Sequence, residues 1–511
     1  MSVVEIDRTK KWYRFWEIFP GALTWLVFIM PIILSLFYPV LVACLVILYA
    51  LYWLTKSILM SVRLIIGYRR YCKDVKINWL KMGKRDFKSW DKIYHLVILA
   101  TYKEELEILR YSISALASSN YSLKKIIFVL ATEERDKKRA SRNARFLKKE
   151  FGDKFLHFAV TVHPQNLPDE VPGKGSNIVY AAQEIKKFID KKKIPYQDII
   201  VTTLDADHRV HPNYLANLTY AYLNDPDPLH KSFQPIPMFF NNIWQVPIPI
   251  RSIGVGSTFW QMIESTQPYR LRNFAAHSQS WQALIETNFW SKKTIVEDGH
   301  QYWRSYFRFN GRYLVVPIFT PIYQDAVLSP YGYFATFKEQ YLQKRRWAWG
   351  CSDIPYVMTY IIGNKKLPFW DKWLQAFRLI EGHFSWATTS VILAFVGWMP
   401  TILNPSFRQT VLAFNFPSIY SKILTTAMIG LVVTLIISTL MLPPRPKRIF
   451  NLSIVVEWII SPVLLPLSNI IFSSFAAIDA QTRLMLGKDL EFRVTEKKPV
   501  GYNNIKTKNE K

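Results

Sequence analysis

The chain has 511 residues, of which 50% are hydrophobic and 15% aromatic, and its formal net charge is +27. The apolar residues lie in long uncharged blocks, which is unusual for a soluble protein and favours one that crosses a membrane. The basic excess suits an anionic membrane surface. The very basic stretch over residues 135–151 has no aromatic side chains interleaved in the way that stacks bases, so we expect no nucleic acid partner. The cysteines Cys44, Cys72 and Cys351 have no metal-like spacing and indicate a reducing compartment.

The first apolar block runs from Phe19 to about Trp53. It is long enough for two spans of about 20 residues each, with a turn at Pro39. Basic residues flank both ends of the block, which predicts that both ends lie in the cytoplasm. We therefore expect a transmembrane hairpin and a linker over residues 1–84. A buried helical hairpin of a soluble domain is the alternative.

Residues 85–340 are expected to form a cytoplasmic catalytic domain, because strand patterns alternate there with helix patterns. Such alternation predicts a parallel α/β sheet of the Rossmann-like kind, with ligands at the carboxyl ends of its strands. We expect strands over residues 93–101, 124–132, 157–164 and 198–207, and helices over residues 104–119, 135–151 and 176–192. Polar groups follow three of these strands, at Thr101–Glu105, Thr132–Asp136 and Asp205–Asp207.

Asp205 and Asp207 form a D-x-D pattern at the end of the fourth expected strand. Side chains at i and i+2 of an extended chain point to the same side. Two carboxylates there would offer hard oxygen ligands to Mg²⁺ or Mn²⁺, and the ion could neutralise a diphosphate. Helix capping after the strand explains such a pair equally well.

Two later motifs also suggest chemistry. Glu297 and Asp298 are adjacent, and a carboxylate held in a cleft can deprotonate an attacking hydroxyl. The alternative is a surface turn, since E-D-G is good turn sequence. Gln343, Arg346 and Trp347 fall on one side of a helix, where an arginine fork suits phosphate. Two adjacent arginines here would be costly unless a diphosphate meets them, although a basic helix on the membrane surface is the competing interpretation.

The rest of the chain is expected to return to the membrane. Residues 341–383 carry the Q-x-x-R-W motif and an interfacial helix, and residues 384–478 form a C-terminal transmembrane region. Within that region we expect spans at Ser385–Leu403 and Ile419–Leu442 and a re-entrant or broken hairpin over Ile449–Ala477. Residues 479–511 are expected to be a cytoplasmic tail.

The D-x-D, E-D and Q-x-x-R-W motifs, in this order and before a span, resemble those of the processive family 2 glycosyltransferases, the cellulose, chitin and hyaluronan synthases. The resemblance covers nearly the whole chain. It implies a GT-A fold inserted between transmembrane hairpins in a multi-pass protein of the cell membrane. It also implies an inverting, metal-dependent transfer from a nucleotide-sugar to a growing polysaccharide. The implied partners are the donor, a glycan or lipid acceptor and membrane lipid, while accessory export subunits are left undefined.

The resemblance also assigns roles to residues. Asp298 would be the general base, with Val296 in place of the usual threonine, and Asp205 and Asp207 would hold the Mg²⁺ or Mn²⁺ and the diphosphate. Gln343, Arg346 and Trp347 would hold the diphosphate and line the acceptor channel. The nucleotide would meet Thr101, Tyr102, Glu104 and Lys174, the last with Asn177 beside it. The family's Asp-Asp pair after the second strand is absent, and Glu133 or Asp136 would substitute, so we expect a UDP-sugar without the base being fixed.

Two other functions compete with this one. A non-processive enzyme of similar architecture would move one sugar to a lipid, as ceramide glucosyltransferases do. A transporter or membrane scaffold with a degenerate domain would carry more polar residues inside its spans than this chain shows.

Overall fold

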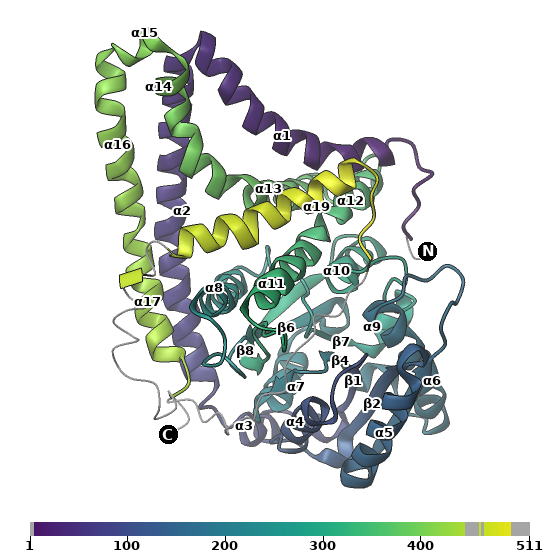
Figure 1. The fold of residues 1–511 in the computed structure, drawn as a ribbon. Helices are drawn as coiled ribbons and strands as arrows, with labels where there is room; N and C mark the ends of the chain where they lie inside the picture. Colours follow the sequence, from purple (N-terminus) through teal and green to yellow (C-terminus); the bar gives the residue numbers. More distant parts are fainter. Residues whose placement is uncertain (1–4, 445–458, 461–463, 492–511) are drawn as a thin grey trace.

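The structure is a computed structural model that describes residues 5–444, 459–460 and 464–491. A domain built on a β-sheet lies on one side of a group of long apolar helices (Figure 1). Among the described residues, four helices are long and apolar enough to cross a membrane: Tyr13–Phe37, Pro39–Asp74, Phe369–Leu403 and Val411–Met441. Their presence agrees with the expected apolar blocks, and the crossing itself stays a prediction.

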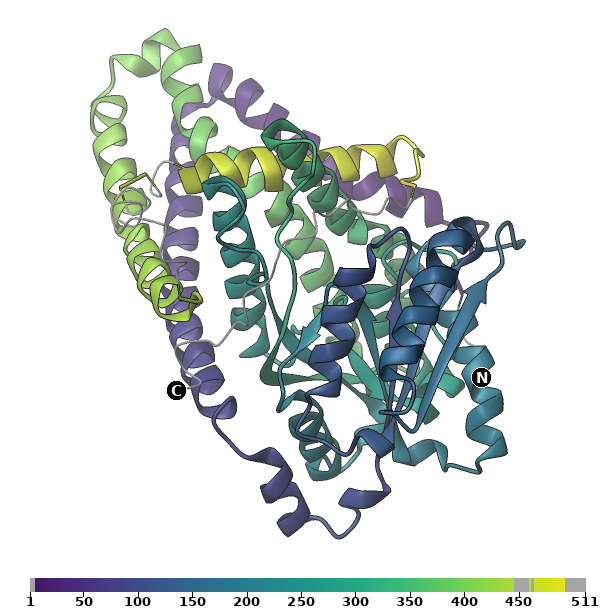
Figure 2. The same cartoon turned by 60° about the horizontal axis from the view of Figure 1, so that its bottom comes forward.

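The N-terminal hairpin turns where the sequence predicted it. Helix α1 (Tyr13–Phe37) and helix α2 (Pro39–Asp74) are separated by Tyr38 alone. Pro39 occupies the first turn of α2, where its missing N–H would have had no partner in the helix. Because α2 continues far beyond the expected span, it reaches from the hairpin turn down to the sheet domain, and α8 (Ile248–Ser265) lies beside it (Figures 1 and 2).

The C-terminal helices differ from the expected division. The boundary predicted at residue 383, between an interfacial helix and a span, falls inside one continuous helix, α13 (Phe369–Phe395). After it come α14 (Met399–Leu403), α15 (Pro405–Arg408), α16 (Val411–Ala427) and α17 (Ile429–Met441). Of the block expected to form a hairpin over Ile449–Ala477, residues 449–458 and 461–463 lie outside the described residues, as does most of the tail. From residue 464 the block is helical and leads through a π-helical turn at Ile470–Ser474 into α19 (Phe475–Met485).

The four predicted strands are all present. They are β1 (Tyr94–Ala100), β2 (Ile126–Glu133), β3 (His157–His163) and β4 (Ile199–Asp205), and they run parallel in the order β3-β2-β1-β4. The predicted helices are also present, as α4 (Leu106–Ala117), α5 (Lys137–Phe151) and α6 (Lys174–Lys191). The register aligns Ala100 with both Ala131 and Asp205, so the polar loops after β1, β2 and β4 leave the sheet at one edge.

The second half of the sheet corrects the prediction of a purely parallel one. The eight strands follow the order β3-β2-β1-β4-β7-β6-β8-β5, and β7 runs antiparallel to β4 and to β6, while β6 and β8 are parallel. The additional strands are β5 (Arg209–Val210), β6 (Lys231–Met238), β7 (Ser278–Ser280) and β8 (Leu314–Tyr323). The sheet is therefore mixed, and β7 joins its two halves.

Helix α11 (Tyr333–Ala348) carries the Q-x-x-R-W motif and crosses the domain boundary expected at residue 340. It packs against α19, between the sheet domain and the apolar helices (Figure 1). Helix α10 (Glu297–Arg308), which begins with the E-D motif, lies nearby and contacts α6. The fold thus gathers the three motifs on the side of the domain that faces the apolar helices.

Candidate active site

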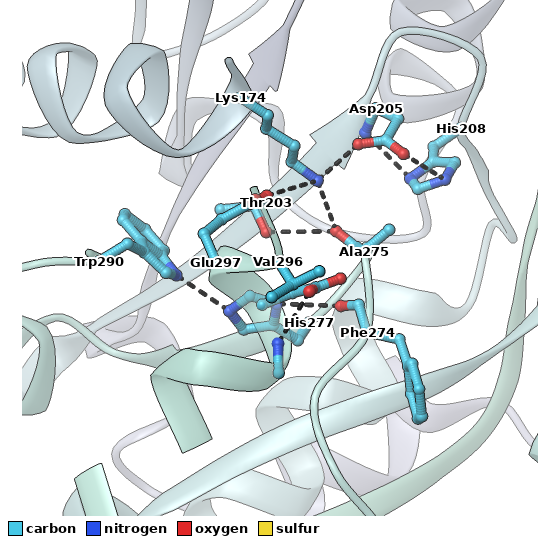
Figure 3. A network of polar contacts seen from close by, with 12 residues as sticks. Lys174, Thr203, Asp205, His208, Phe274, Ala275, His277, Trp290, Val296 and Glu297 are labelled. Atoms are coloured by element: carbon cyan, nitrogen blue, oxygen red, sulfur yellow. Dashed lines mark hydrogen bonds and ion pairs between the residues drawn. The ribbon is translucent and has the colours of Figure 1, made fainter. Parts of the chain in front are cut away.

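Lys174, the first residue of α6, connects three distant parts of the chain. Its Nζ donates hydrogen bonds to Asp205 Oδ1 at 2.5 Å and to the carbonyl of Ala275 at 3.0 Å, and it lies 4.0 Å from Glu297 Oε1 (Figure 3). Its side chain is 12% exposed, against 37% for Asp205. The end of β4, the start of α6 and the start of α10 therefore meet around one ammonium group.

The charges of this site act on one another. Burial alone would lower the pKa of Lys174, but the nearby carboxylates of Asp205 and Glu297 raise it above its ordinary value. Burial also raises the pKa of Asp298. Lys174 and Arg346 both oppose that rise in the pKa of Asp298, while Asp205 adds to it. Carboxylates and cations from β4, α6, α10 and α11 thus lie within electrostatic reach of one another.

The E-D motif starts helix α10, with Glu297 buried and Asp298 partly buried, so it is not an exposed surface turn. Glu297 is 5% exposed and Asp298 Oδ1 accepts the N–H of Gly299 at 2.8 Å. Carboxylates in the first turn of α10 are stabilised by the helix dipole. Gly175 permits the close approach of α6, because a Cβ there would lie 3.0 Å from Ser291 O and 3.1 Å from Glu297 Cβ.

The D-x-D pair does not have the extended geometry that we expected. Strand β4 ends at Asp205, and the chain turns through Ala206 and Asp207. Asp207 is buried, and its Oδ2 accepts the N–H of Asp325 at 2.8 Å. His208 accepts the N–H of Asp205 on Nδ1 and therefore donates from Nε2, to Gln324 Oε1 at 2.7 Å. The turn is thus fixed against the end of β8, and Asp205 is the more accessible carboxylate.

Metal binding here would need ligands beyond the chain. In the part of the protein that the structure describes, no group of three or more His, Cys, Asp or Glu side chains could hold a metal ion. Asp205 and Asp207 still offer oxygen ligands of the kind that Mg²⁺ or Mn²⁺ prefers. Magnesium is commonly bound through one or two carboxylates, with substrate phosphates and water completing its shell. The residues therefore fit an ion that arrives with a diphosphate.

The loop after β1 is closed by its own carboxylate. Glu104 Oε2 accepts hydrogen bonds from Thr101 Oγ1 at 2.7 Å and from the N–H of Tyr102 at 2.6 Å. The next N–H, of Lys103, donates to Asp136 Oδ2 at 3.0 Å. The loops after β1 and β2 are therefore bonded to each other at the edge where Asp205 also lies.

Glu133, at the end of β2, is buried and paired with Arg135. Burial raises the pKa of Glu133 even though Arg135 opposes the rise. The Arg135 guanidinium also lies 4.4 Å from the ring centre of Tyr102. Arg135 joins the expected nucleotide residues in this cluster, and the sequence analysis missed it. Asn177 has a structural position instead: it is 1% exposed and donates a hydrogen bond to Ala131 O at 2.9 Å, which connects α6 to β2.

The two adjacent arginines of α11 have different partners, which corrects the expectation that both meet a diphosphate. Arg345 Nη1 donates to Asp479 Oδ2 on α19 at 2.8 Å. Arg346 is the one within electrostatic reach of Asp298. A basic helix exposed on a membrane surface does not describe this arrangement, because α11 is held between the domain and α19.

The other motif side chains of α11 are largely packed. Gln343 is buried and its Oε1 accepts from Gln340 Nε2 at 3.4 Å. The centre of the Trp347 ring lies 5.9 Å from that of the Phe239 ring and 4.4 Å from Lys344 Nζ. Trp347 is therefore held against the domain core, with part of its surface left open.

Two further groups at the site have no signature in the sequence. The carbonyl of Ala275 accepts from Lys174, and any residue type could have supplied it. His277 donates from Nδ1 to Phe274 O at 3.0 Å and accepts from Trp290 Nε1 on Nε2 at 3.1 Å (Figure 3). Burial, followed by the charge of Lys174, lowers the pKa of His277 to about 3, so the ring stays neutral and fixes the segment that bears Ala275.

No family model matches the chain, and no curated protein matches it. Among solved structures, it is similar to the mannosyltransferase PcManGT from Pyrobaculum calidifontis in complex with GDP-Man and Mn²⁺, with 13% identity, a TM-score of 0.41 and coverage of 84% of this chain and 100% of that one. It is also similar to S. aureus TarS 1–349 in complex with UDP-GlcNAc, with 12% identity, a TM-score of 0.33 and coverage of 81% of this chain and 97% of that one.

Proposed function

We propose that the protein is an inverting, metal-dependent glycosyltransferase that moves a sugar from a nucleotide-sugar, with a UDP-sugar as the first candidate, to a growing polysaccharide at the membrane. The observation that carries the proposal is the meeting of Asp205 and Asp298 around Lys174, with Arg346 within electrostatic reach of Asp298. The resemblance of the three motifs to those of the family 2 synthases supports the same conclusion. In this proposal the domain is a GT-A domain on the cytoplasmic face of a multi-pass protein.

An inverting transfer is an in-line displacement at the anomeric carbon. The attacking hydroxyl must lose a proton on one face of the sugar, and the diphosphate leaves from the other. In the proposed mechanism Asp298 takes the proton, and its raised pKa brings it closer to the pH at which a general base works best. Lys174 and Arg346 face the leaving diphosphate with fixed positive charge, which stabilises the charge that develops there.

A divalent ion, when bound, would be held by Asp205 and Asp207 and would neutralise part of the diphosphate charge. The nucleotide would lie along the loops after β1 and β2, against Tyr102, Glu133 and Asp136, with Arg135 as an added donor. Gln343 and Trp347 would border the acceptor side of the site. The packing of both side chains suits a wall of fixed shape better than a mobile contact.

Transfer of a single sugar to a lipid is the second candidate, because the site faces the apolar helices α2 and α13 rather than the far side of the sheet (Figure 1). Both candidates share the donor chemistry and differ in the product. A transporter or scaffold would need none of the buried charges at the start of α10.

The experiment is a donor screen on the full-length protein in detergent or lipid nanodiscs. UDP-sugars and GDP-sugars are supplied one at a time with Mn²⁺ or Mg²⁺, and release of the nucleoside diphosphate is measured. We expect turnover with one class of donor and its loss on chelation of the metal. Absence of both turnover and binding for every donor would overturn the proposal. The length of the labelled product separates a polymer from a single-sugar adduct.

A further inference from the structure

A second group of charges lies where the sheet domain meets the apolar helices. The segment that follows α8 carries Arg270 and Arg272, and it crosses close to α2 and α13. Arg270 lies 3.6 Å from Glu264 Oε2 through its Nε and 3.8 Å from Glu381 Oε2 through its Nη2. Among the described residues its buried Nε has no hydrogen-bond partner. Arg270 is therefore held by charge at distances longer than a normal hydrogen bond.

Positive charge is in excess at this place. Burial raises the pKa of Glu264, and Arg270, Arg272 and Arg63 all oppose the rise, so these groups lie within electrostatic reach of one another. Glu381 is already engaged by Lys56 Nζ at 2.5 Å. In the described part of the chain, the side chains that face one another here are the cations Lys56, Arg63, Arg270, Arg272 and Arg378 and the carboxylates Glu264, Asp371 and Glu381. Arg272 Nη1 already donates to the carbonyls of Arg270 and Leu271, and Arg378 Nη1 to the carbonyl of Tyr269. A further anion would therefore be met by the excess charge and by the guanidinium N–H groups that these bonds leave, above all those of Arg270.

The surroundings of this cluster are typical of a membrane boundary. Two of its cations, Lys56 and Arg63, lie on α2, and Arg378 lies on α13, and both helices are apolar enough to span a membrane. Aromatic side chains close to it in the chain are exposed: Trp260 by 46%, Tyr269 by 67%, Trp373 by 37% and Phe377 by 64%. Exposed aromatic residues next to arginines are the usual composition of the zone where lipid headgroups lie.

The cluster is also connected to the candidate active site. Arg272 lies 4.1 Å from the ring centre of Tyr302, which is on α10, one turn after Asp298. Arg272 also donates to Gln375 Oε1 on α13 at 2.5 Å. The same segment continues to Ala275, whose carbonyl accepts from Lys174. A ligand seated on these arginines would therefore lie beside the helix that carries the proposed base.

We propose that Arg270, Arg272 and Arg378 bind the phosphate of a membrane lipid at this boundary and hold that lipid where it can serve as the acceptor. Arginine forks match phosphate oxygens in geometry, and basic pockets between membrane helices select anionic headgroups. The acceptor role rests on the second candidate function, transfer of a single sugar to a lipid, whereas the lipid site does not. The two can therefore fail separately, because lipid binding is measured without any donor.

The test uses the full-length protein in nanodiscs of phosphatidylcholine alone or of an equal mixture with phosphatidic acid. Lipid retained on the protein is counted by native mass spectrometry. We expect selective retention of phosphatidic acid, and about a tenfold loss of it in an Arg272→Gln/Arg378→Gln double variant, since each removed arginine takes away charge-assisted bonds to phosphate. The lysine double variant, Arg272→Lys/Arg378→Lys, should keep part of the retention, which separates lost charge from misfolding.

The matched control removes the same charge elsewhere. Arg142 and Arg145 are exposed on α5, at the part of the sheet domain away from α2 (Figure 1). An Arg142→Gln/Arg145→Gln variant should retain phosphatidic acid like the wild type. Equal loss in this control, or a wild type without preference between the two lipids, would overturn the site. Release of the lipid by inorganic phosphate at millimolar concentration would assign the arginines to free phosphate and overturn the lipid assignment.

Discussion

Arg345 of α11 and Asp479 of α19 form a hydrogen-bonded ion pair of 2.8 Å, and this pair leaves the next residue, Arg346, as the arginine within reach of Asp298. Asp479 also accepts from Arg483 at 2.7 Å, four residues further along α19. One arginine therefore fixes the position of α11 and the other contributes charge to the site. The sequence alone could not separate the two.

This separation predicts different outcomes for two adjacent substitutions. Arg345→Gln should lower the free energy of unfolding by up to about 1 kcal/mol, since the pair is partly exposed, and should change the donor KM little. Arg346→Gln should weaken donor binding about 10-fold to 100-fold, because a charge-assisted contact to the diphosphate is lost. Thermal unfolding and donor titration measure the two effects. Equal KM changes in both variants would contradict the assignment.

Asp298 gives the clearest test of the proposed chemistry. Asp298→Asn keeps the size of the side chain and its place at the start of α10 but cannot take a proton. We expect kcat to fall about 10²-fold to 10⁴-fold while donor binding is largely kept. Glu297→Gln is the matched control, because it removes the adjacent carboxylate and leaves Asp298 in place. The effect of Glu297→Gln on kcat should be much smaller. Unchanged turnover in Asp298→Asn would show that another group is the base.

Lys174 neutralises the carboxylates that meet around it. Lys174→Met would leave Asp205 and Glu297 without the ammonium that now lies 2.5 Å and 4.0 Å away. Removing one partner of a fully buried ion pair costs about 3–5 kcal/mol. Because Asp205 is 37% exposed and solvent screens its charge, we expect a smaller drop in the free energy of unfolding at neutral pH, about 1–3 kcal/mol. Donor binding should also be lost. Lys174→Arg, which keeps the charge, should retain most of the stability, and chemical unfolding of both variants provides the measurement.

The first half of the sheet was predictable because its strands are continuous apolar runs separated by amphipathic helices. The second half was not, for identifiable reasons. Strand β7 consists of three polar residues, and its register in the sheet comes from contacts with β4 and β6. Strands β6 and β8 contain prolines, among them Pro235 and Pro317, which normally argue against a strand because proline cannot donate to the ladder.

The site was predictable to the extent that its side chains carry distinctive chemistry. The motifs led to Asp205, Asp298 and Arg346, which share one electrostatic environment in the structure. The predicted geometry of Asp207 was wrong. The turn after β4 is fixed by a hydrogen bond from the backbone N–H of Asp325 to Asp207, and no sequence motif indicates this bond. The carbonyl of Ala275 has no sequence signature at all. The positions of Asp207 and of the Ala275 carbonyl thus depend on tertiary contacts of the main chain, which the sequence pattern does not show.

Lys344 provides a test that depends on burial alone. It lies in α11 with Nζ donating to Ser257 Oγ at 2.8 Å, and burial lowers its pKa to about 7 from an ordinary 10.5. Between these two pH values the unfolded chain binds more protons than the folded one at this residue. The contribution of Lys344 to the free energy of unfolding therefore rises as pH increases from about 7 towards 10.5.

Lys344→Met removes this pH dependence and keeps an unbranched side chain against Trp347. At pH 7 the variant should be more stable than the wild type by about 1–3 kcal/mol, the usual cost of a buried polar group with incomplete compensation. The advantage should shrink as the pH is raised, because the free energy needed to deprotonate the wild-type amine on folding falls as the pH approaches 10.5, its ordinary pKa in the unfolded chain. The exposed Lys338 lies on the same helix, so Lys338→Met serves as the control and should change stability little at any pH. The measurement is thermal unfolding of the wild type and the two variants between pH 7 and pH 9.5. If the stability difference between Lys344→Met and the wild type were constant across that range, Lys344 would be charged in the folded protein.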